Sequence, residues 1–209
     1  MAAPAARHSY TVDEYLAFER AARYKSEYVE GQIVAMTGAS EEHNLVTLNV
    51  GAELREQLRE RPCRVYVADM RVKVSVSGLY TYPDVVVVCG EPRFEDAHVD
   101  TLLNPTIIVE VLSPSIEAYD RGAKFGYYRE LPSLREYLLV AQHKVLVEHY
   151  IREDDHWVFT AAGKLEDVVP LPSAGAELPL AEVYHKVDFP VSLPGSLDDQ
   201  QPSRDSQVD

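Results

Sequence analysis

The chain has 209 residues, of which 46% are hydrophobic, and its formal net charge is −14 at pH 7. This length suits one domain with a good core, and no apolar run approaches the roughly 18 residues of a membrane span. The acidic balance also argues against a protein with a basic stripe for polyanions, because affinity for nucleic acid comes largely from neutralising phosphates.

The first part of the chain predicts a helix, a hairpin and a second helix. Thr11 and Glu14 have the spacing of a capping box, which predicts a helix to about Ala22. Residues 27–36 predict a β-hairpin that turns at Glu30 and Gly31. Ser40 is a suitable N-cap for a helix that proline ends near residues 61–62. The side chains expected to be buried in the two helices are those of Tyr15, Leu16, Phe18, Leu45, Leu48, Ala52 and Leu58.

Strands dominate the rest. Residues 64–74 predict one strand, with Met70, Val72 and Val74 on one side and Arg71 and Lys73 on the other. A turn at residues 77–78, an apolar strand at 85–89, a polar loop at about 90–104 and a buried strand at 106–112 follow. A helix at about 118–131, strands at 136–141, 144–151 and 157–160, and a short helix at 180–184 complete the pattern. This order favours an α/β fold (an α+β mixed sheet), with helices packed on the sheet.

The two ends differ from the middle in composition. We expect residues 1–9 and the acidic tail 191–209 to be disordered, and residues 10–190 to form one domain. The first residues lack the apolar segment of a signal peptide. Cys63 and Cys89 do not have Cys-x-x-Cys spacing, so we expect two reduced, partly buried thiols in a cytoplasmic protein.

Two acidic residues stand out. Glu110 lies inside a strand that is otherwise apolar on both faces, and a buried carboxylate must be paired, protonated or bound to a metal. Asp84 follows Pro83 at the start of the neighbouring apolar strand. A solvent-facing or ion-paired Glu110 and an ordinary turn aspartate are the alternatives. Together the two carboxylates at adjacent strand ends favour a site for a divalent cation such as Mg²⁺.

These residues also carry a resemblance to a known family. Residues 82–88 and 107–115, which include the run Glu-Val-Leu-Ser-Pro-Ser, resemble the Uma-type family of putative restriction endonucleases in the PD-(D/E)XK superfamily. Residues 26–33, 135–140 and the positions His43, Asp120, Arg121, Lys124 and Tyr128 are similar to its pattern as well. The similarity covers about residues 10–190. It implies a restriction-endonuclease-like core sheet flanked by helices and a metal-dependent phosphodiesterase site.

The resemblance implies roles for particular residues. Asp84, Glu110 and the Val111 carbonyl would hold Mg²⁺ or Mn²⁺, and Glu27 would add a carboxylate unless it is an exposed hairpin residue. The superfamily pattern has a lysine two residues after the glutamate, where this chain has Leu112.

The family pattern makes Lys124 the candidate that replaces this lysine and positions the attacking water. The alternative is a solvated helix lysine paired with Asp120. Lys73 is a weaker candidate, and a direct role for His43 is a further possibility.

Three functions remain open from the sequence. The first is a metal-dependent endonuclease that hydrolyses phosphodiester bonds of nucleic acid, with DNA as the expected substrate, a homodimer as the expected assembly and no membrane association. The second is a catalytically inactive interaction module on the same fold, motivated by Leu112 and the acidic charge. The third is a hydrolase that acts on a small phosphorylated substrate.

Overall fold

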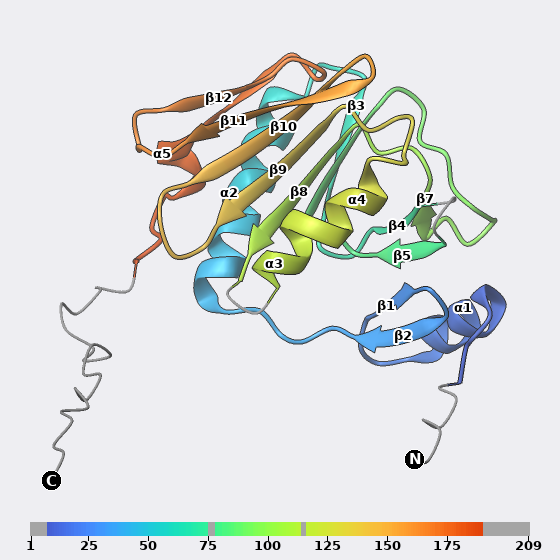
Figure 1. Cartoon of the computed structure of the whole chain (residues 1–209). Coiled ribbons are helices and arrows are strands. Elements are labelled where there is room, and N and C mark those ends of the chain that lie inside the picture. Colours follow the sequence, from blue (N-terminus) through green and yellow to red (C-terminus); the bar gives the residue numbers. More distant parts are fainter. Residues whose placement is uncertain (1–7, 75–77, 114–115, 190–209) are drawn as a thin grey trace, which may run out of the picture.

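The computed structural model describes residues 8–74, 78–113 and 116–189. Its main sheet has six strands in the order β11-β10-β9-β8-β6-β3 (Figure 1). Strands β8 and β9 run parallel, and the other neighbouring pairs are antiparallel. The strands are β3 Cys63–Val67, β6 Val85–Cys89, β8 Ile107–Leu112, β9 Glu136–Ala141, β10 Val147–Glu153 and β11 His156–Ala162.

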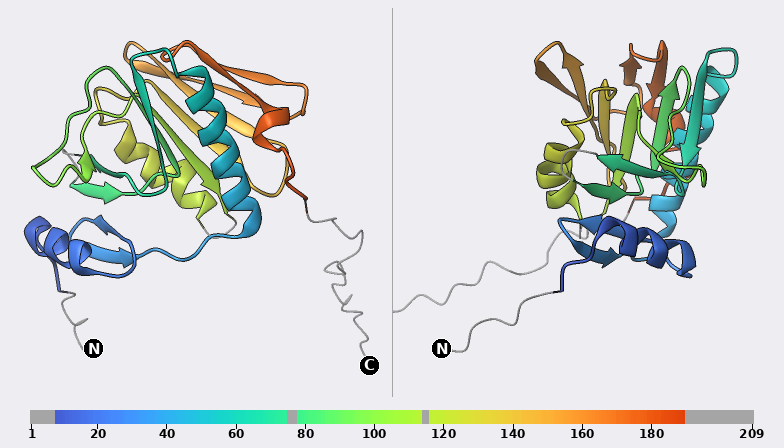
Figure 2. Two further views of the ribbon diagram at one scale, coloured as in Figure 1. Left: turned by 180° about the vertical axis from the view of Figure 1, so that it is seen from behind. Right: turned by 90° about the vertical axis from the view of Figure 1, so that its right-hand side faces the viewer.

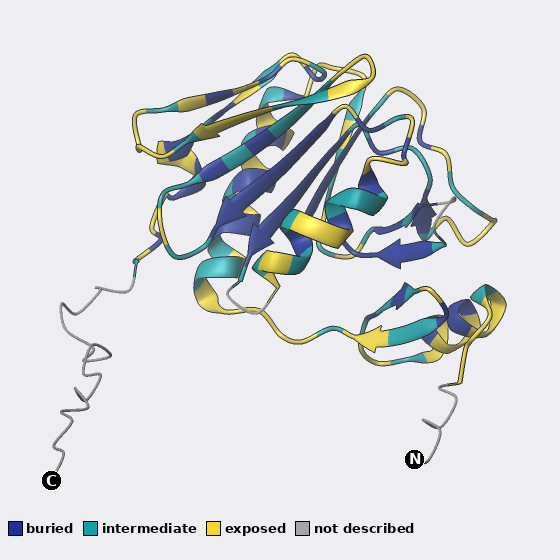
Figure 3. Ribbon diagram, viewed as in Figure 1, coloured by how far each residue is buried: buried dark blue, intermediate teal, exposed yellow. Residues whose placement is uncertain are grey.

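Helices cover both faces of this sheet, as the side view in Figure 2 shows. Helix α2, Glu41–Gln57, is capped at its N-terminus by Ser40, whose side chain accepts a hydrogen bond from the N–H of His43. On the opposite face lie α3 Glu117–Tyr119, a π-helical turn Asp120–Lys124 and α4 Phe125–Tyr128. The central strands β8 and β9 are buried along their whole length because both faces are covered (Figure 3).

A second sheet, in the order β2-β1-β5-β4-β7, lies beside the first. Its strands are β1 Ser26–Val29, β2 Gln32–Ala35, β4 Arg71–Val74, β5 Leu79–Thr81 and β7 Thr101–Leu102. Helix α1, Val12–Ala21, has the predicted capping box and packs Tyr15 against Tyr28 and Tyr80. The chain then ends the described region with β12 Val168–Leu171, β13 Ala176–Pro179 and α5 Leu180–Val183.

The segment 64–74 is not one strand, as the sequence predicted, but two strands in different sheets. Ala68 has φ of +63°, a left-handed conformation that ends β3, and its N–H bonds the carbonyl of Asp84. Arg71, predicted on the polar side of that strand, is buried, and its guanidinium contacts Thr101, Tyr82 and Asp100. A buried guanidinium is tolerated here because these oxygen atoms replace its water.

Asp100 forms ion pairs with the guanidinium groups of Arg20 and Arg71. Hydrogen bonds from Arg20, together with the charge of Arg71, hold the pKa of Asp100 well below its usual range, despite partial burial that opposes this shift. The ion pairs fasten the loop that leads into β7 onto α1 and β4. Strand β7 lies in a region that the sequence predicted to be a polar loop.

Other predictions need smaller corrections. Phe18 of α1 and Leu48 and Ala52 of α2 are exposed; the buried stripe of α2 consists of Val46, Val50 and Leu54 instead. Helix α2 ends at Gln57, before the predicted end at residues 61–62. Strands β12 and β13 were not predicted, because each contains a proline, which argues against a strand in the sequence. The predicted turn at residues 77–78 falls partly, and the predicted acidic tail wholly, outside the described residues.

The expectation of two reduced thiols is also wrong, because Cys63 and Cys89 form a disulfide. The register of β3 and β6 places these residues opposite each other. Their Cα atoms are 4.0 Å apart, and the two positions are 26 residues apart in sequence, so no local spacing revealed the pair. Among the described residues, no helix is long and apolar enough to cross a membrane.

Candidate active site

The two carboxylates predicted from the sequence meet at one end of the main sheet. Strands β6 and β8 pair with Val85 opposite Val109, and this antiparallel register, extended by one residue, puts Asp84 opposite Glu110. The Asp84 Oδ2 atom accepts the backbone N–H of Val111 at 2.7 Å. Asp84 retains some exposure, with 18% of its side chain accessible, whereas only 3% of the Glu110 side chain is accessible.

Glu110 is held by two donors from the helical face. Its Oε1 atom accepts hydrogen bonds from the Tyr128 hydroxyl at 2.7 Å and from the Lys124 Nζ atom at 2.9 Å. Burial raises the pKa of Glu110 to about 8, with Lys124 opposing this shift and the charges of Asp120 and Asp84 adding to it. This carboxyl group therefore holds a proton more tightly than a solvent-exposed glutamate does.

Lys124 lies at the centre of an acidic cluster, which we define as Glu27, Asp84, Glu110 and Asp120. Its Nζ atom is 2.9 Å from Glu110 Oε1, 3.2 Å from Glu27 Oε1 and 3.5 Å from Asp120 Oδ1. Burial alone would lower the pKa of Lys124, but these three carboxylates raise it well above its ordinary value. The ammonium group is thus the internal counter-ion of the cluster.

Local chain geometry explains why Lys124 and Asp120 both point inward. They lie one turn apart at the two ends of the π-helical turn, and both are buried. A π-turn inside a helix shifts the following side chains around the axis and occurs often at functional sites. Tyr128, four residues after Lys124, lies on the same helical face and reaches Glu110.

Asp120 is the least satisfied member of the acidic cluster. Neither of its carboxylate oxygens has a hydrogen-bond partner among the described residues, and only the ion pair with Lys124 compensates it. Burial raises its pKa to about 6, opposed by Lys124 and reinforced by Glu27 and Asp84. The sequence placed Asp120 in the family's helix pattern and offered it as an ion-pair partner of Lys124, without predicting its burial.

Glu27 comes to the cluster from the second sheet. It lies in β1, and its Oε1 atom also accepts the Thr81 hydroxyl of β5. Its side chain is 13% accessible, so it is not the exposed hairpin residue of the alternative interpretation. Because β1 belongs to the N-terminal hairpin, residues from both sheets close the cluster (Figure 1).

His43 completes the site on its α2 side. The His43 Nε2 atom is 3.4 Å from Asp84 Oδ2, and the imidazole also bonds the backbone carbonyl of Val111. Burial would lower the pKa of His43, but hydrogen bonding to Asp84 and the Val111 carbonyl raises it.

Lys73, the weaker lysine candidate, lies elsewhere, paired with Glu95 and Tyr80.

The donor set fits a hard cation in its chemistry. Asp84, Glu110 and the Val111 carbonyl supply oxygen atoms, and Mg²⁺ needs only one or two carboxylates beside water and phosphate oxygens. The orphaned oxygens of Asp120 add negative charge without a full complement of protein donors. Among the described residues, no three His, Cys, Asp or Glu side chains are already arranged to hold an ion. A cation would therefore share the site with water and substrate rather than enter a closed protein cage.

Comparisons with known proteins extend over most of the chain. The family model of the Uma2 putative restriction endonucleases matches residues 12–181. The uncharacterized protein sll1609 of Synechocystis sp. is 42% identical over 151 residues, covering 72% of this chain and 85% of that protein. The uncharacterized protein slr1290 of the same organism is 35% identical over 181 residues, covering 85% and 92%.

A solved structure shares the fold. It is the crystal structure of a putative nuclease belonging to DUF820 from Anabaena variabilis, with a TM-score of 0.67. The match covers 83% of this chain and 97% of that chain at 17% sequence identity. The α/β restriction-endonuclease-like architecture predicted from the sequence is thereby confirmed.

Proposed function

Because the chain belongs to the Uma2 family of putative restriction endonucleases, we propose that it is a metal-dependent endonuclease of nucleic acid. The observation that carries this proposal is the meeting of Asp84, Glu110 and the Val111 backbone beside a buried lysine. A divalent cation at these oxygens would polarise a phosphodiester and acidify a bound water. Mg²⁺ or Mn²⁺ is the expected ion, and DNA the expected substrate.

The chain's own residues have distinct tasks in this proposal. Asp84 and Glu110 bind the cation, and the N–H of Val111 fixes the orientation of the Asp84 carboxylate. Lys124 takes the part of the lysine that is missing at Leu112, orienting the attacking water and offsetting charge that develops on the phosphate. Glu27 and Asp120 hold the ammonium group in position.

His43 and Tyr128 support the two metal-binding carboxylates. The Tyr128 hydroxyl donates to Glu110 and limits the rise of its pKa. His43 contacts Asp84 near the accessible side of the site, where its positive charge, when it is protonated, would favour a phosphate. A homodimer would supply two such sites for the two strands of a duplex.

The test is Mg²⁺ or Mn²⁺ binding by calorimetry, followed by cleavage of single-stranded and double-stranded DNA, RNA and small phosphodiesters. We expect binding and cleavage by the wild type and loss of both in Asp84→Asn, with the variant still folded by circular dichroism. Lys73→Met, outside the acidic cluster, is the matched control and should cleave normally. Equal cleavage by Asp84→Asn would remove the proposed site, and cleavage of small phosphodiesters alone would reassign the substrate.

A further inference from the structure

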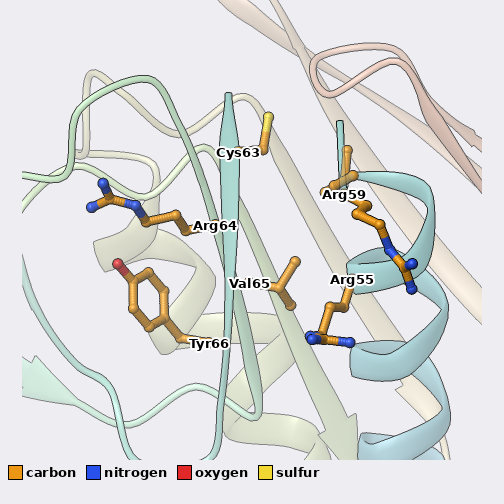
Figure 4. Close-up of a pocket in the computed structure, with 7 residues that line it drawn as sticks. Arg55, Arg59, Cys63, Arg64, Val65 and Tyr66 are labelled. Carbon is orange, nitrogen blue, oxygen red and sulfur yellow. The ribbon is translucent and has the colours of Figure 1, made fainter. Parts of the chain in front are cut away.

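A hollow with three arginines lies at the free edge of the main sheet, apart from the acidic cluster. Its lining residues are Arg55, Leu58, Arg59, Cys63, Arg64, Val65 and Tyr66, and none of them is acidic (Figure 4). We call it the arginine hollow. Such a concentration of positive charge is notable in a chain whose net charge is −14.

Two elements position the arginines around one strand. Arg55 belongs to the last turn of α2, Arg59 follows this helix, and Arg64 belongs to β3. Figure 4 shows Arg64 and Tyr66 on one side of β3, with Val65 pointing to the side of α2. The hollow therefore wraps around the edge of the sheet and presents guanidinium groups from both of its faces.

The charges of the hollow are only partly compensated. Arg59 pairs with Glu56. Arg55 and Arg64 are exposed, and within the part of the chain that the structure describes neither has a carboxylate partner. Unpaired guanidinium groups remain available for an external anion, for which their planar fork is well suited.

The backbone of β3 adds a donor at the same place. Strand β3 is the last strand of its sheet, so only one of its edges is paired. The N–H of Gly90 bonds the carbonyl of Pro62, and the N–H of Ala68 bonds the carbonyl of Asp84. The backbone N–H and C=O groups of the even-numbered residues of β3 therefore point toward β6. By alternation, the N–H of Val65 points away from β6, toward the free edge. Free amide and guanidinium donors together favour a polyanion over a cation or an apolar partner.

The hollow is connected to the proposed active site through the pairing of β3 with β6. Arg64 lies opposite Val88, and Asp84 precedes Val88 by four positions. At about 3.3 Å per residue, this separation is about 13 Å, which corresponds to about four nucleotides of one strand. Arg64 and Tyr66 also project to the face of the sheet on which Glu110 meets Lys124, because Tyr66 packs with the cluster of Val86, Val88 and Ile108.

We propose that the arginine hollow binds the phosphate backbone of the nucleic acid about four nucleotides from the bond at the acidic cluster. This inference takes nucleic acid as the substrate from the proposed function. It also supplies a local positive surface for a polyanion on a chain whose net charge is negative. Arg55 and Arg64 contact phosphates, and the Tyr66 ring is placed to stack on a base. The acidic remainder of the surface repels nucleic acid and confines it to this path.

The test measures binding without cleavage. Fluorescence anisotropy of a labelled oligonucleotide is recorded in EDTA over a series of salt concentrations, for the full-length wild type and for Arg55→Ala/Arg64→Ala. We expect the double variant to bind more weakly by about tenfold for each arginine at low salt. The slope of log K against log salt should fall by about 2 in magnitude. Arg135→Ala is the matched control, since Arg135 is also exposed but lines a different hollow.

Each outcome decides the proposal. Weaker binding in the double variant and near-normal binding in the control support it, even if the wild type cleaves nothing. Equal losses in both variants, or no loss in either, overturn it, even if the wild type is an active nuclease. An arginine at a sheet edge can also block edge-to-edge pairing. If the double variant self-associates in gel filtration while its monomer fraction binds normally, the arginines only protect the edge and the proposal fails.

Discussion

Replacing Lys124 by methionine tests the electrostatics of the site in depth. Methionine preserves most of the side-chain stem and removes the ammonium group that three buried carboxylates share. Removing one partner of a buried ion pair costs about 3–5 kcal/mol, because the remaining charge is left uncompensated. Glu110, whose pKa is raised to about 8, can take up a proton instead, which places the expected loss near the lower limit, about 3 kcal/mol at neutral pH.

The sign of the pH dependence follows from the same carboxylates. Removing the charge of Lys124 raises the pKa of Glu110 further, so the carboxylates of the variant are protonated more readily, and the loss should be smaller at about pH 6 than at about pH 9. A divalent cation that binds the folded variant should restore about 2.7 kcal/mol at a concentration a hundredfold above its Kd.

The assay is urea unfolding followed by circular dichroism, in EDTA and with Mg²⁺. Lys164→Met, at an exposed position, is the matched control and should change the unfolding free energy by less than about 0.5 kcal/mol. A Lys124→Met variant as stable as the wild type in EDTA at about pH 9 would refute the assignment of an ammonium group among ionised carboxylates.

Three further predictions concern other groups. Tyr128→Phe removes the donor that lowers the Glu110 pKa, so the acidic limb of the pH–rate profile for cleavage should move to higher pH; an unmoved limb would contradict the role of this hydrogen bond. Asp100→Asn should cost about 2 kcal/mol at neutral pH in thermal unfolding, less than a fully buried pair because Asp100 is one-third exposed. The pKa of Asp100 is lower in the folded state than in the unfolded state, so Asp100 stabilises the wild type above its unfolded pKa. The difference in stability between wild type and variant should therefore vanish as the pH falls through the folded pKa. A difference that does not change with pH would exclude this linkage. Cys63→Ser, which opens the disulfide across 26 residues, should lower the unfolding free energy by about 3.5 kcal/mol, and thiol titration of the unfolded, unreduced wild type should find no free cysteine; two free thiols would contradict the bridge.

The sequence predicted the central pair of the site because its signal is local. A carboxylate inside an apolar strand and another at the start of the next apolar strand require explanation wherever they occur. Antiparallel pairing of β6 with β8 then brings Asp84 and Glu110 together. The same locality explains why the capping box of α1 and the hairpin turn at Glu30 and Gly31 were predicted correctly.

Features that depend on distant segments were harder to predict. The disulfide and the contact of His43 with Asp84 are products of register and helix packing, which single positions do not reveal. The left-handed turn at Ala68, which divides the predicted strand, has no glycine or asparagine as its signal. The arginine hollow lies in a segment that also contains Glu56 and Glu60, so its charge is visible only once β3 and α2 are placed.

The net charge of −14 raised the main objection to a nucleic-acid substrate. Where the charged side chains lie in the structure matters more for this objection than their sum. Buried carboxylates such as Glu110 and Asp120 contribute to the negative sum but face Lys124 instead of solvent. Three arginines line the arginine hollow, and no acidic residue lines it. A nuclease needs a positive path along its substrate, which is compatible with an acidic total.

The most direct test of the account is nicking and linearisation of supercoiled plasmid at low salt. Wild type and Glu110→Ala are compared with Mg²⁺, with Mn²⁺ and with EDTA, after both proteins are shown to be folded. The account predicts cleavage by the wild type that requires a metal, and none by Glu110→Ala. Cleavage that persists in Glu110→Ala, or a folded wild type that cleaves with neither metal, would contradict it.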